Sequence, residues 1–257
     1  MTDYGLVSII TPNYNCARFI SETIKSVQAQ TYPNWEMIIV DDCSTDGSDK
    51  VVEPYMEEDQ RIRFLRNEYN SGAAVSRNYA LREAKGRWIA FLDSDDLWMP
   101  EKLEKQLRFM VKNGYYFSYH NSFDIDENGV EKGRLVTGPK KVGPISIYNY
   151  DWIGCLAAIY DQEAVGLIQI EDIKKNNDYA MWMKVCKKVP CYLLDETLAK
   201  YRIRQGSISR HSKTALIKWH YKLFNEAEHQ NPVLAGFNTV RNLFFGVIKK
   251  IVYEKIY

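Results

Sequence analysis

The first hundred residues alternate short apolar runs with segments in which apolar residues recur every three or four positions. A short apolar run bounded by turn-forming residues is typical of a buried strand, and the longer spacing is typical of a helix that packs one face. The pattern predicts strands at residues 6–11, 37–40, 62–65 and 88–92, and helices at residues 20–27, 48–56 and 73–84. Such alternation favours right-handed crossovers, so we expect an α/β fold with a mainly parallel, doubly wound sheet and helices on both faces.

The pattern is less regular after residue 100. Pro100 is a favourable first residue for a helix that we expect to end near residue 112. Further on, the sequence predicts strands at 115–121, 152–160 and 191–203, a helix at 179–188, a turn at 126–129, and a loop rich in Gly, Pro and Lys at 132–144. We therefore divide the chain into two halves of one domain, residues 1–100 and 101–210, and a C-terminal helical segment, residues 211–257.

The C-terminal residues 237–257 have the pattern of an amphipathic helix. Its apolar side carries Phe237, Val240, Phe244, Ile248 and Ile251, and its cations are Arg241, Lys249, Lys250 and Lys255. A helix of this kind can lie flat on an anionic membrane surface. It can equally pack on its own domain or on a second copy of the chain, and the pattern leaves these alternatives open.

Composition narrows the class of protein. The formal net charge of +1 gives no electrostatic reason to expect a nucleic-acid partner. Five scattered cysteines without a CxxC pair indicate neither a disulfide framework nor a zinc site, and they suit a reducing cytoplasm. There is no secretory signal pattern, and no apolar stretch approaches the ~20 residues that span a bilayer. We expect a cytoplasmic protein, placed at the inner face of the membrane if its C-terminal helix binds lipid.

Two of the predicted strands end in acidic loops. Asp93, Asp95 and Asp96 follow the apolar run at 88–92, and Asp41 and Asp42 follow the run at 37–40. Carboxylates this close raise one another's pKa and are usually tolerated where a cation lies between them. Because ligands of open α/β sheets bind at the carboxyl ends of the strands, both loops are expected to face one crevice that holds a metal ion.

Four motifs in the first hundred residues resemble, in order and spacing, those of the family 2 glycosyltransferases. They are Ser8-Ile9-Ile10-Thr11-Pro12-Asn13-Tyr14-Asn15, Val40-Asp41-Asp42-Cys43-Ser44-Thr45-Asp46-Gly47, Asn70-Ser71-Gly72 through Ser76-Arg77-Asn78, and Asp93-Ser94-Asp95-Asp96. Later in the chain the resemblance continues only at islands, which are Asn177-Asp178-Tyr179 with Trp182, and Tyr201-Arg202 with Ser207.

The resemblance implies a GT-A fold, which is Rossmann-like, with residues 1–100 as the half that binds the nucleotide-sugar donor and residues 101–210 as the half that binds the acceptor. It also implies inversion at the anomeric carbon and a divalent metal ion, Mn²⁺ or Mg²⁺. The chemistry agrees, because the departing nucleoside diphosphate gathers negative charge and the acceptor hydroxyl needs a base. We expect a UDP-sugar donor and an acceptor hydroxyl on a saccharide or lipid-linked saccharide in cell-surface polysaccharide or glycolipid assembly.

The resemblance also assigns residues to the donor site. In Asp93-Ser94-Asp95, Asp95 is the expected direct metal ligand, and Asp93 serves the ribose or the metal's water. Asp42 resembles the aspartate that contacts the nucleotide base, while Thr11 and Asn13 lie in the motif beside the nucleoside. Arg77 either reaches the diphosphate or holds Asp93 by an ion pair.

The later islands carry the remaining expected roles. Asp178 is the expected general base, although a helix N-terminus lowers a carboxylate's pKa, so burial or a nearby acid must compensate; a simple helix cap is the alternative. Arg202 and Arg204 are expected in the donor site, and Arg204 is expected to meet the diphosphate. Arg204 stands where the family often has a His, and a guanidinium pairs with phosphate but does not ligate a metal. Trp98 and Trp182 are candidate platforms for a sugar ring, with core packing as the alternative.

Three other functions fit parts of the pattern. Asp93-Ser94-Asp95 after an apolar strand also resembles the site of a haloacid-dehalogenase-like phosphohydrolase, but that nucleophile usually follows the first strand. A nucleotidyltransferase normally needs a Gly-rich basic loop after its first strand, which Pro12-Asn13-Tyr14-Asn15 is not. A catalytically degenerate nucleotide-sugar-binding module would be expected to lose carboxylates that this chain retains.

Overall fold

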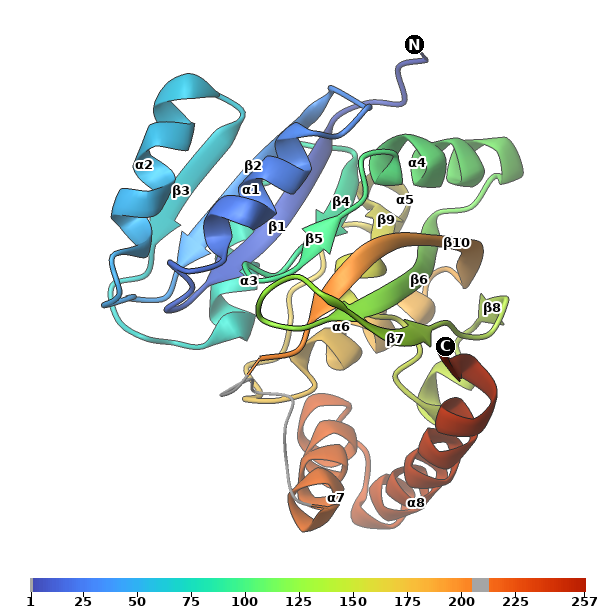
Figure 1. The fold of residues 1–257 in the computed structure, drawn as a ribbon. Coiled ribbons are helices and arrows are strands. Elements are labelled where there is room, and N and C mark those ends of the chain that lie inside the picture. Colours follow the sequence, from blue (N-terminus) through green and yellow to red (C-terminus); the bar gives the residue numbers. More distant parts are fainter. Residues whose placement is uncertain (1, 205–212) are drawn as a thin grey trace.

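The computed structural model describes residues 2–204 and 213–257 (Figure 1). Its central sheet has the strand order β11-β7-β6-β9-β4-β1-β2-β3, and β10 pairs with β5 (Leu97–Trp98), β6 and β8 beside this path. The main strands are β1 (Val7–Asn13), β2 (Trp35–Asp41), β3 (Ile62–Arg66), β4 (Trp88–Phe91), β6 (Phe117–Ile125), β9 (Ile159–Asp161) and β10 (Cys191–Arg202). The expected α/β class is confirmed.

The first half of the sheet is parallel and covered on both faces. In β3-β2-β1-β4 the longest ladder joins β1 and β2, from Val7 beside Trp35 to Asn13 beside Asp41. Alternate residues of these strands pack against α1 (Ile20–Gln28), α2 (Ser48–Glu58) and α4 (Lys102–Asn113) on one face, and against α3 (Ala73–Glu83) and α6 (Asn177–Cys186) on the other. Burial on both faces explains why these strands are nearly continuous apolar runs.

The second half of the sheet is mixed. Strand β9 runs antiparallel between β4 and β6, and β6 runs parallel to β10. The loop predicted at 132–144 is wrong in part, because it contains β8 (Lys141–Val142) and most of β7 (Glu131–Val136), short strands at the edge of the sheet. The strand predicted at 152–160 is largely wrong: a 3₁₀ turn at Cys155–Ala157 precedes β9. Its apolar residues are buried there without strand pairing, which periodicity alone does not distinguish.

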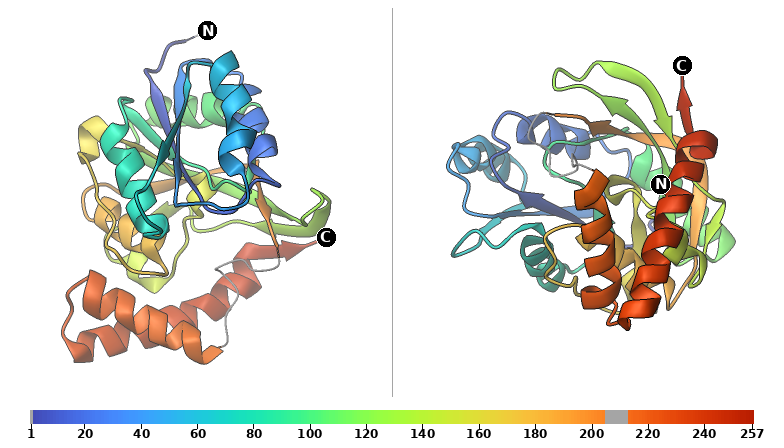
Figure 2. Two further views of the ribbon diagram at one scale, coloured as in Figure 1. Left: turned by 90° about the vertical axis from the view of Figure 1, so that its left-hand side faces the viewer. Right: turned by 90° about the horizontal axis from the view of Figure 1, so that it is seen from below.

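The C-terminal segment forms a layer of its own on one side of the domain, as Figure 2 shows. It contains α7 (Lys213–Lys222), α8 (Pro232–Ile248) and a π-helical turn after each of them. The expected helical end is wrong for the last residues: β11 (Glu254–Ile256) joins the sheet by pairing antiparallel with β7. Among the described helices, none has both the length and the apolar character needed to cross a membrane.

A close backbone approach fixes the join between α3 and β4. The buried Ser8 hydroxyl donates to Glu36 and accepts from the backbone N–H of Gly86, and Glu36 also accepts from the N–H of Lys85. A Cβ at Gly86 would lie 2.6 Å from the Ser8 amide nitrogen and 2.7 Å from the Leu6 carbonyl oxygen. Only glycine fits this contact, which fixes the entry of β4 and therefore the acidic loop at its end.

We predict that Gly86→Ala lowers the free energy of unfolding by about 1–3 kcal/mol, because the new methyl group must displace backbone atoms. The matched control is Gly236→Ala in α8, where a Cβ meets nothing within 4 Å. That substitution should be neutral or stabilise by up to about 1 kcal/mol through helix propensity. Urea unfolding of the three proteins measures both effects, and an unchanged midpoint for Gly86→Ala would contradict the close-contact argument.

Candidate functional site

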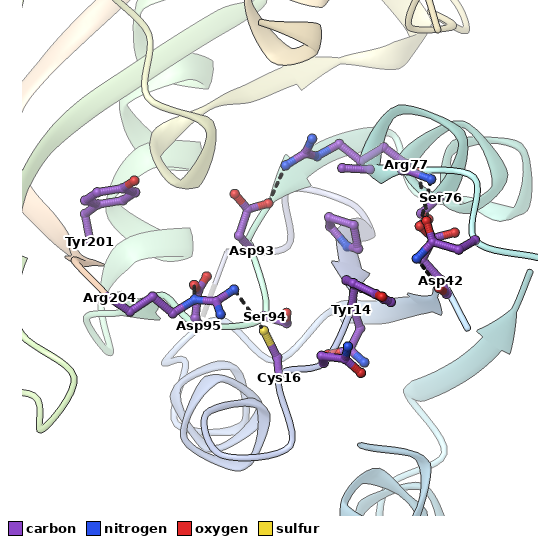
Figure 3. A pocket seen from close by; sticks show the side chains of 16 residues that line it. Tyr14, Cys16, Asp42, Ser76, Arg77, Asp93, Ser94, Asp95, Tyr201 and Arg204 are labelled. Carbon is purple, nitrogen blue, oxygen red and sulfur yellow. Dashed lines mark hydrogen bonds and ion pairs between the residues drawn. The ribbon is translucent and has the colours of Figure 1, made fainter. Parts of the chain in front are cut away.

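The two acidic loops face one pocket at the carboxyl ends of β1, β2 and β4. The cavity has a volume of about 530 Å³. In Figure 3, Asp42 lies at one end of it and Asp95 with Arg204 at the other. The residues that line it are Pro12, Asn13, Tyr14, Asn15, Cys16, Asp42, Asn70, Gly72, Ala73, Ser76, Arg77, Asp93, Ser94, Asp95, Tyr201 and Arg204. The expectation that both loops share one crevice is confirmed.

The Asp42 end of the pocket is built by hydrogen bonds to a carboxylate. Asp42 accepts from the backbone N–H groups of Ser71 and Gly72 at 2.8 and 2.7 Å, and from the Asn67 side chain at 2.8 Å. Gly72 has φ +90° at the start of α3, a conformation that favours glycine. Asp42 therefore ties the end of β2 to the turn before α3.

The loop after β1 is held to the loop after β2. The amide of Asn13 donates to Asp41 at 2.7 Å and to Ser44 at 3.3 Å, and both partners are buried. Asn13 itself lines the pocket, whereas Asp41 serves to hold it. These contacts fix the loop from Pro12 to Cys16, which forms one wall of the pocket.

The carboxylates after β4 repel one another. Burial and the charges of Asp93 and Asp95 raise the pKa of Asp96 well above its usual range. Burial raises the pKa of Asp95, Asp93 raises it further, and Arg204 acts in the opposite direction. Asp96 points away from the pocket and accepts from the backbone N–H of Arg202 at 2.8 Å. A cation between Asp93 and Asp95 would relieve this repulsion.

Arg77 connects the acidic loop to the start of α6. Its guanidinium donates to Asp93 at 2.5 Å and to the Asn177 side-chain oxygen at 2.7 Å, and it is almost fully buried. Burial lowers the pKa of Arg77, but the nearby Asp93, Cys155 and Asp178 together outweigh burial, and the net effect is a rise. Of the two roles expected for Arg77, the structure contains the ion pair with Asp93. Asn177 accepts the second hydrogen bond.

Arg204 holds the other carboxylate of the acidic loop. Its Nε donates to Asp95 at 2.6 Å and one terminal nitrogen contacts the Cys16 sulfur at 3.4 Å. The guanidinium lines the pocket, as expected for a group that meets phosphate. Ser207 and the other residues from 205 to 212 lie outside the described part of the chain.

Asp178 lies in the first turn of α6, directly after Asn177. Its side chain is half-buried and accepts from the backbone N–H of Tyr179 at 2.9 Å. Burial raises its pKa, Arg77 and the Tyr179 N–H lower it, and Asp93 raises it; the net effect is a rise. Burial thus offsets the lowering of the pKa by the helix N-terminus, which a general base at this position requires. Asp178 is not among the residues that line the pocket in Figure 3.

Two residues expected in the donor site lie elsewhere. Thr11 is fully buried on β1 and does not line the pocket. Arg202 is also buried: it pairs with Glu22 at 2.7 Å and donates to the carbonyl oxygen of Asp95 at 2.7 Å. It also donates to the carbonyls of Asp126 and Glu127. Arg202 therefore holds the acidic loop but does not line the pocket, so its expected place in the donor site is wrong.

The two tryptophans proposed as sugar platforms belong to the core. Trp182 is fully buried and packs edge-to-face on Phe91, with ring centroids 5.1 Å apart. Trp98 is buried and donates its indole N–H to the carbonyl oxygen of Leu156 at 2.8 Å, with the Lys102 ammonium 3.8 Å from its ring centroid. Neither ring presents a face to the pocket, so this interpretation is wrong and packing explains both residues.

The pocket also contains residues that the sequence analysis did not select. Besides Pro12, Asn70, Gly72 and Ala73, they are Tyr14, Asn15, Cys16, Ser76 and Tyr201. Tyr14 is 49% exposed at the pocket's wall, which makes it the most accessible aromatic ring there. The position of Tyr14 directly after β1, at the edge where ligands bind in α/β sheets, is the signal that could have identified it.

Asp93 and Asp95 are the residues that could hold a metal ion. Among residues 2–204 and 213–257, no three His, Cys, Asp or Glu side chains are grouped as a protein-only metal site. Mg²⁺ and Mn²⁺ prefer oxygen ligands, and Mg²⁺ is often bound by one or two carboxylates together with substrate phosphates. Two mutually repelling carboxylates fit a cation of this kind, and the arginine beside them fits the phosphates that would bind together with it.

Comparisons with known proteins identify relatives of this chain. The family model described as glycosyl transferase family 2 matches residues 8–162. The putative teichuronic acid biosynthesis glycosyltransferase TuaG of Bacillus subtilis is 43% identical over 216 residues, covering 83% of this chain and 86% of TuaG. The Escherichia coli protein named UDP-Glc:alpha-D-GlcNAc-diphosphoundecaprenol beta-1,3-glucosyltransferase WfgD is 39% identical over 240 residues, covering 92% and 88% of the two chains.

Solved structures share the fold. TarS 1-349 of S. aureus in complex with UDP-GlcNAc has a TM-score of 0.70 at 22% identity, covering 92% of this chain and 71% of TarS. The mannosyltransferase PcManGT of Pyrobaculum calidifontis, in complex with GDP-Man and Mn²⁺, has a TM-score of 0.66 at 16% identity, covering 96% and 76%. The fold expected from the resemblance is thus confirmed. Since the family model spans more than half of the chain and both curated relatives cover most of it, the protein belongs to glycosyl transferase family 2.

Proposed function

We propose that this protein transfers a sugar, with inversion, from a UDP-sugar to a hydroxyl of a lipid-linked saccharide in cell-surface polysaccharide assembly. The observation that carries the proposal is the pocket in which the Asp42 loop, the paired carboxylates Asp93 and Asp95, and Arg204 come together. The names of the relatives support the rest. WfgD is named for UDP-Glc and a diphosphoundecaprenol acceptor, and TuaG for teichuronic acid biosynthesis.

The two ends of the pocket suggest how the donor binds. The nucleoside would lie against the loop after β1 and the turn held by Asp42, and the diphosphate would lie toward Asp93 and Asp95. A divalent metal ion held there by Asp95 and Asp93 would neutralise charge on the departing diphosphate. Arg204 is placed to pair with a phosphate oxygen, because Asp95 engages only its Nε and, among the described residues, the one contact of its terminal nitrogens in the pocket is the weak one to the Cys16 sulfur.

The contacts of Arg77 fix the position of the acceptor side of the site relative to the donor side. The chain of hydrogen bonds from Asp93 through Arg77 to Asn177 links the acidic loop to the first turn of α6. Asp178, next in the chain, would take the proton from the acceptor hydroxyl as that oxygen attacks the anomeric carbon. Its raised pKa makes it a stronger base than an ordinary aspartate.

The nucleotide is tested by calorimetry with UDP, GDP, dTDP and CDP, each with Mn²⁺ and again with a chelator. We expect metal-dependent binding of UDP and weak or no binding of the others. Binding of GDP in preference to UDP would overturn the choice of nucleotide and leave the class of enzyme intact. Absence of binding by all four would favour a module that has lost its donor site.

Asp95→Asn should weaken metal-dependent UDP binding by about ten- to a hundredfold, the loss expected for a charge-assisted contact. Asp172→Asn, a change of the same kind at an exposed residue outside the pocket, is the control. Arg204→Gln separates the phosphate role from the metal role, since it should weaken binding equally with Mn²⁺ and with chelator. If Asp95→Asn keeps the full difference between Mn²⁺ and chelator, Asp95 is not the metal ligand.

Asp178→Asn should leave UDP binding intact and lower kcat by about 10²–10⁴-fold, the usual contribution of a general base. A base acts when deprotonated, so activity should fall as the pH drops through the pKa of Asp178. Because that pKa is raised, the acid limb of kcat/KM should lie above the ~3.9 of an ordinary aspartate. The residual activity of Asp178→Asn should lack this limb. Equal loss of UDP binding in Asp178→Asn would show that the residue acts in the donor site instead.

A further inference from the structure

The outer face of α8 is apolar over the whole length of the helix and beyond it. Six residues on this side have exposed fractions between 58% for Val247 and 84% for Val233. They are Val233, Phe237, Val240, Phe244, Val247 and Ile251, which we call the outer stripe. Alternating steps of four and three residues place all six on one side of the helix.

The inner face of the same helix is unusually polar. Its buried residues are Ala235, Asn238, Thr239 and Asn242. Asn242 donates to the hydroxyl of Tyr179 at 2.9 Å, and Asn238 donates to the side chain of Gln230 at 2.9 Å. A surface helix normally buries its apolar stripe and exposes its polar side. In α8, Phe245 packs on the core, but three of the four buried residues are polar, and the outer stripe is left for a non-polar partner outside the domain.

The charges around the outer stripe are cationic. Between residues 213 and 257 there are seven Lys and Arg against three Asp and Glu, whereas the rest of the chain has 27 against 30. Lys218, Lys250 and Lys255 are exposed in this segment. At one flank of α8, Arg241 and Lys141 line a shallow cavity beside Ile145, whose side chain is 74% exposed.

These two features distinguish the partner. The stripe's spacing would also suit helix pairing with a second copy of the chain, but no acidic residue lies in α8 to balance Arg241 and Lys250 across such a seam. A bilayer with anionic headgroups provides both an apolar layer for the stripe and negative charge for the surrounding lysines. We propose that α8 lies flat on an anionic lipid bilayer, with the outer stripe inserted between the headgroups.

The test is flotation of the purified protein with vesicles of phosphatidylcholine, with and without phosphatidylglycerol. We expect binding to the anionic vesicles that weakens as salt is raised. Phe237→Gln/Phe244→Gln should reduce the partition coefficient by at least about tenfold, because each ring loses its transfer into an apolar layer. Lys250→Gln/Lys255→Gln should reduce binding to anionic vesicles by about fivefold per lysine, with little effect on neutral ones.

Val130→Gln/Leu167→Gln is the matched control, since both side chains are exposed and lie outside the C-terminal layer. It should bind vesicles as the unmodified protein does. Melting temperature and UDP binding of every variant show whether the fold is intact. They also separate failure of this inference from failure of the proposed function, because vesicle binding needs no donor.

Three results would overturn the inference. The first is that the unmodified protein does not float with vesicles that contain phosphatidylglycerol. The second is that Phe237→Gln/Phe244→Gln binds them as well as the control does. The third is a stable dimer by analytical ultracentrifugation that this double variant converts to monomer, which would assign the outer stripe to a second copy of the chain.

Discussion

The structure of the site depends on one electrostatic constraint, which is three carboxylates within four residues at the end of β4. Left alone, these charges would repel one another, and burial together with the neighbouring carboxylates raises the pKa of Asp95 and of Asp96. The protein balances them with arginines from distant parts of the chain. Arg77 comes from α3, and Arg202 and Arg204 come from the end of β10.

Each of these arginines sets the position of a further element. Arg77 contacts both Asp93 and Asn177, so it fixes the start of α6 relative to the acidic loop. Arg202 connects the same loop to α1 through Glu22 and to the turn after β6 through two carbonyl oxygens. The pocket is therefore built around the acidic loop. The carboxylates that repel one another in this loop also fix, through their arginine partners, the elements that form the walls of the pocket.

The sequence predicted the first half of the fold well because its strands are buried on both faces and read as apolar runs between turn residues. The prediction failed at residues 152–160, where apolar residues are buried without pairing as a strand. It also failed at β11, which is a short and polar strand. The carboxylates of the site were found because a cluster of charge after an apolar run has few structural explanations. The sequence did not reveal the directions of four buried side chains, which are Thr11, Trp98, Trp182 and Arg202. The direction of a side chain depends on strand register and packing, which a motif does not contain.

The polar inner face of α8 has a consequence for the site. It is fastened to α6 by the hydrogen bond from Asn242 to Tyr179, the residue after Asp178. Arg77 fastens the same turn of α6 to the acidic loop through Asn177. If α8 lies on a bilayer, these two links fix the height of Asp178 and of the donor pocket above the lipid surface. An acceptor held by a lipid anchor would then meet Asp178 at a set depth, because the hydrogen bond from Asn242 to Tyr179 joins α8 directly to the first turn of α6.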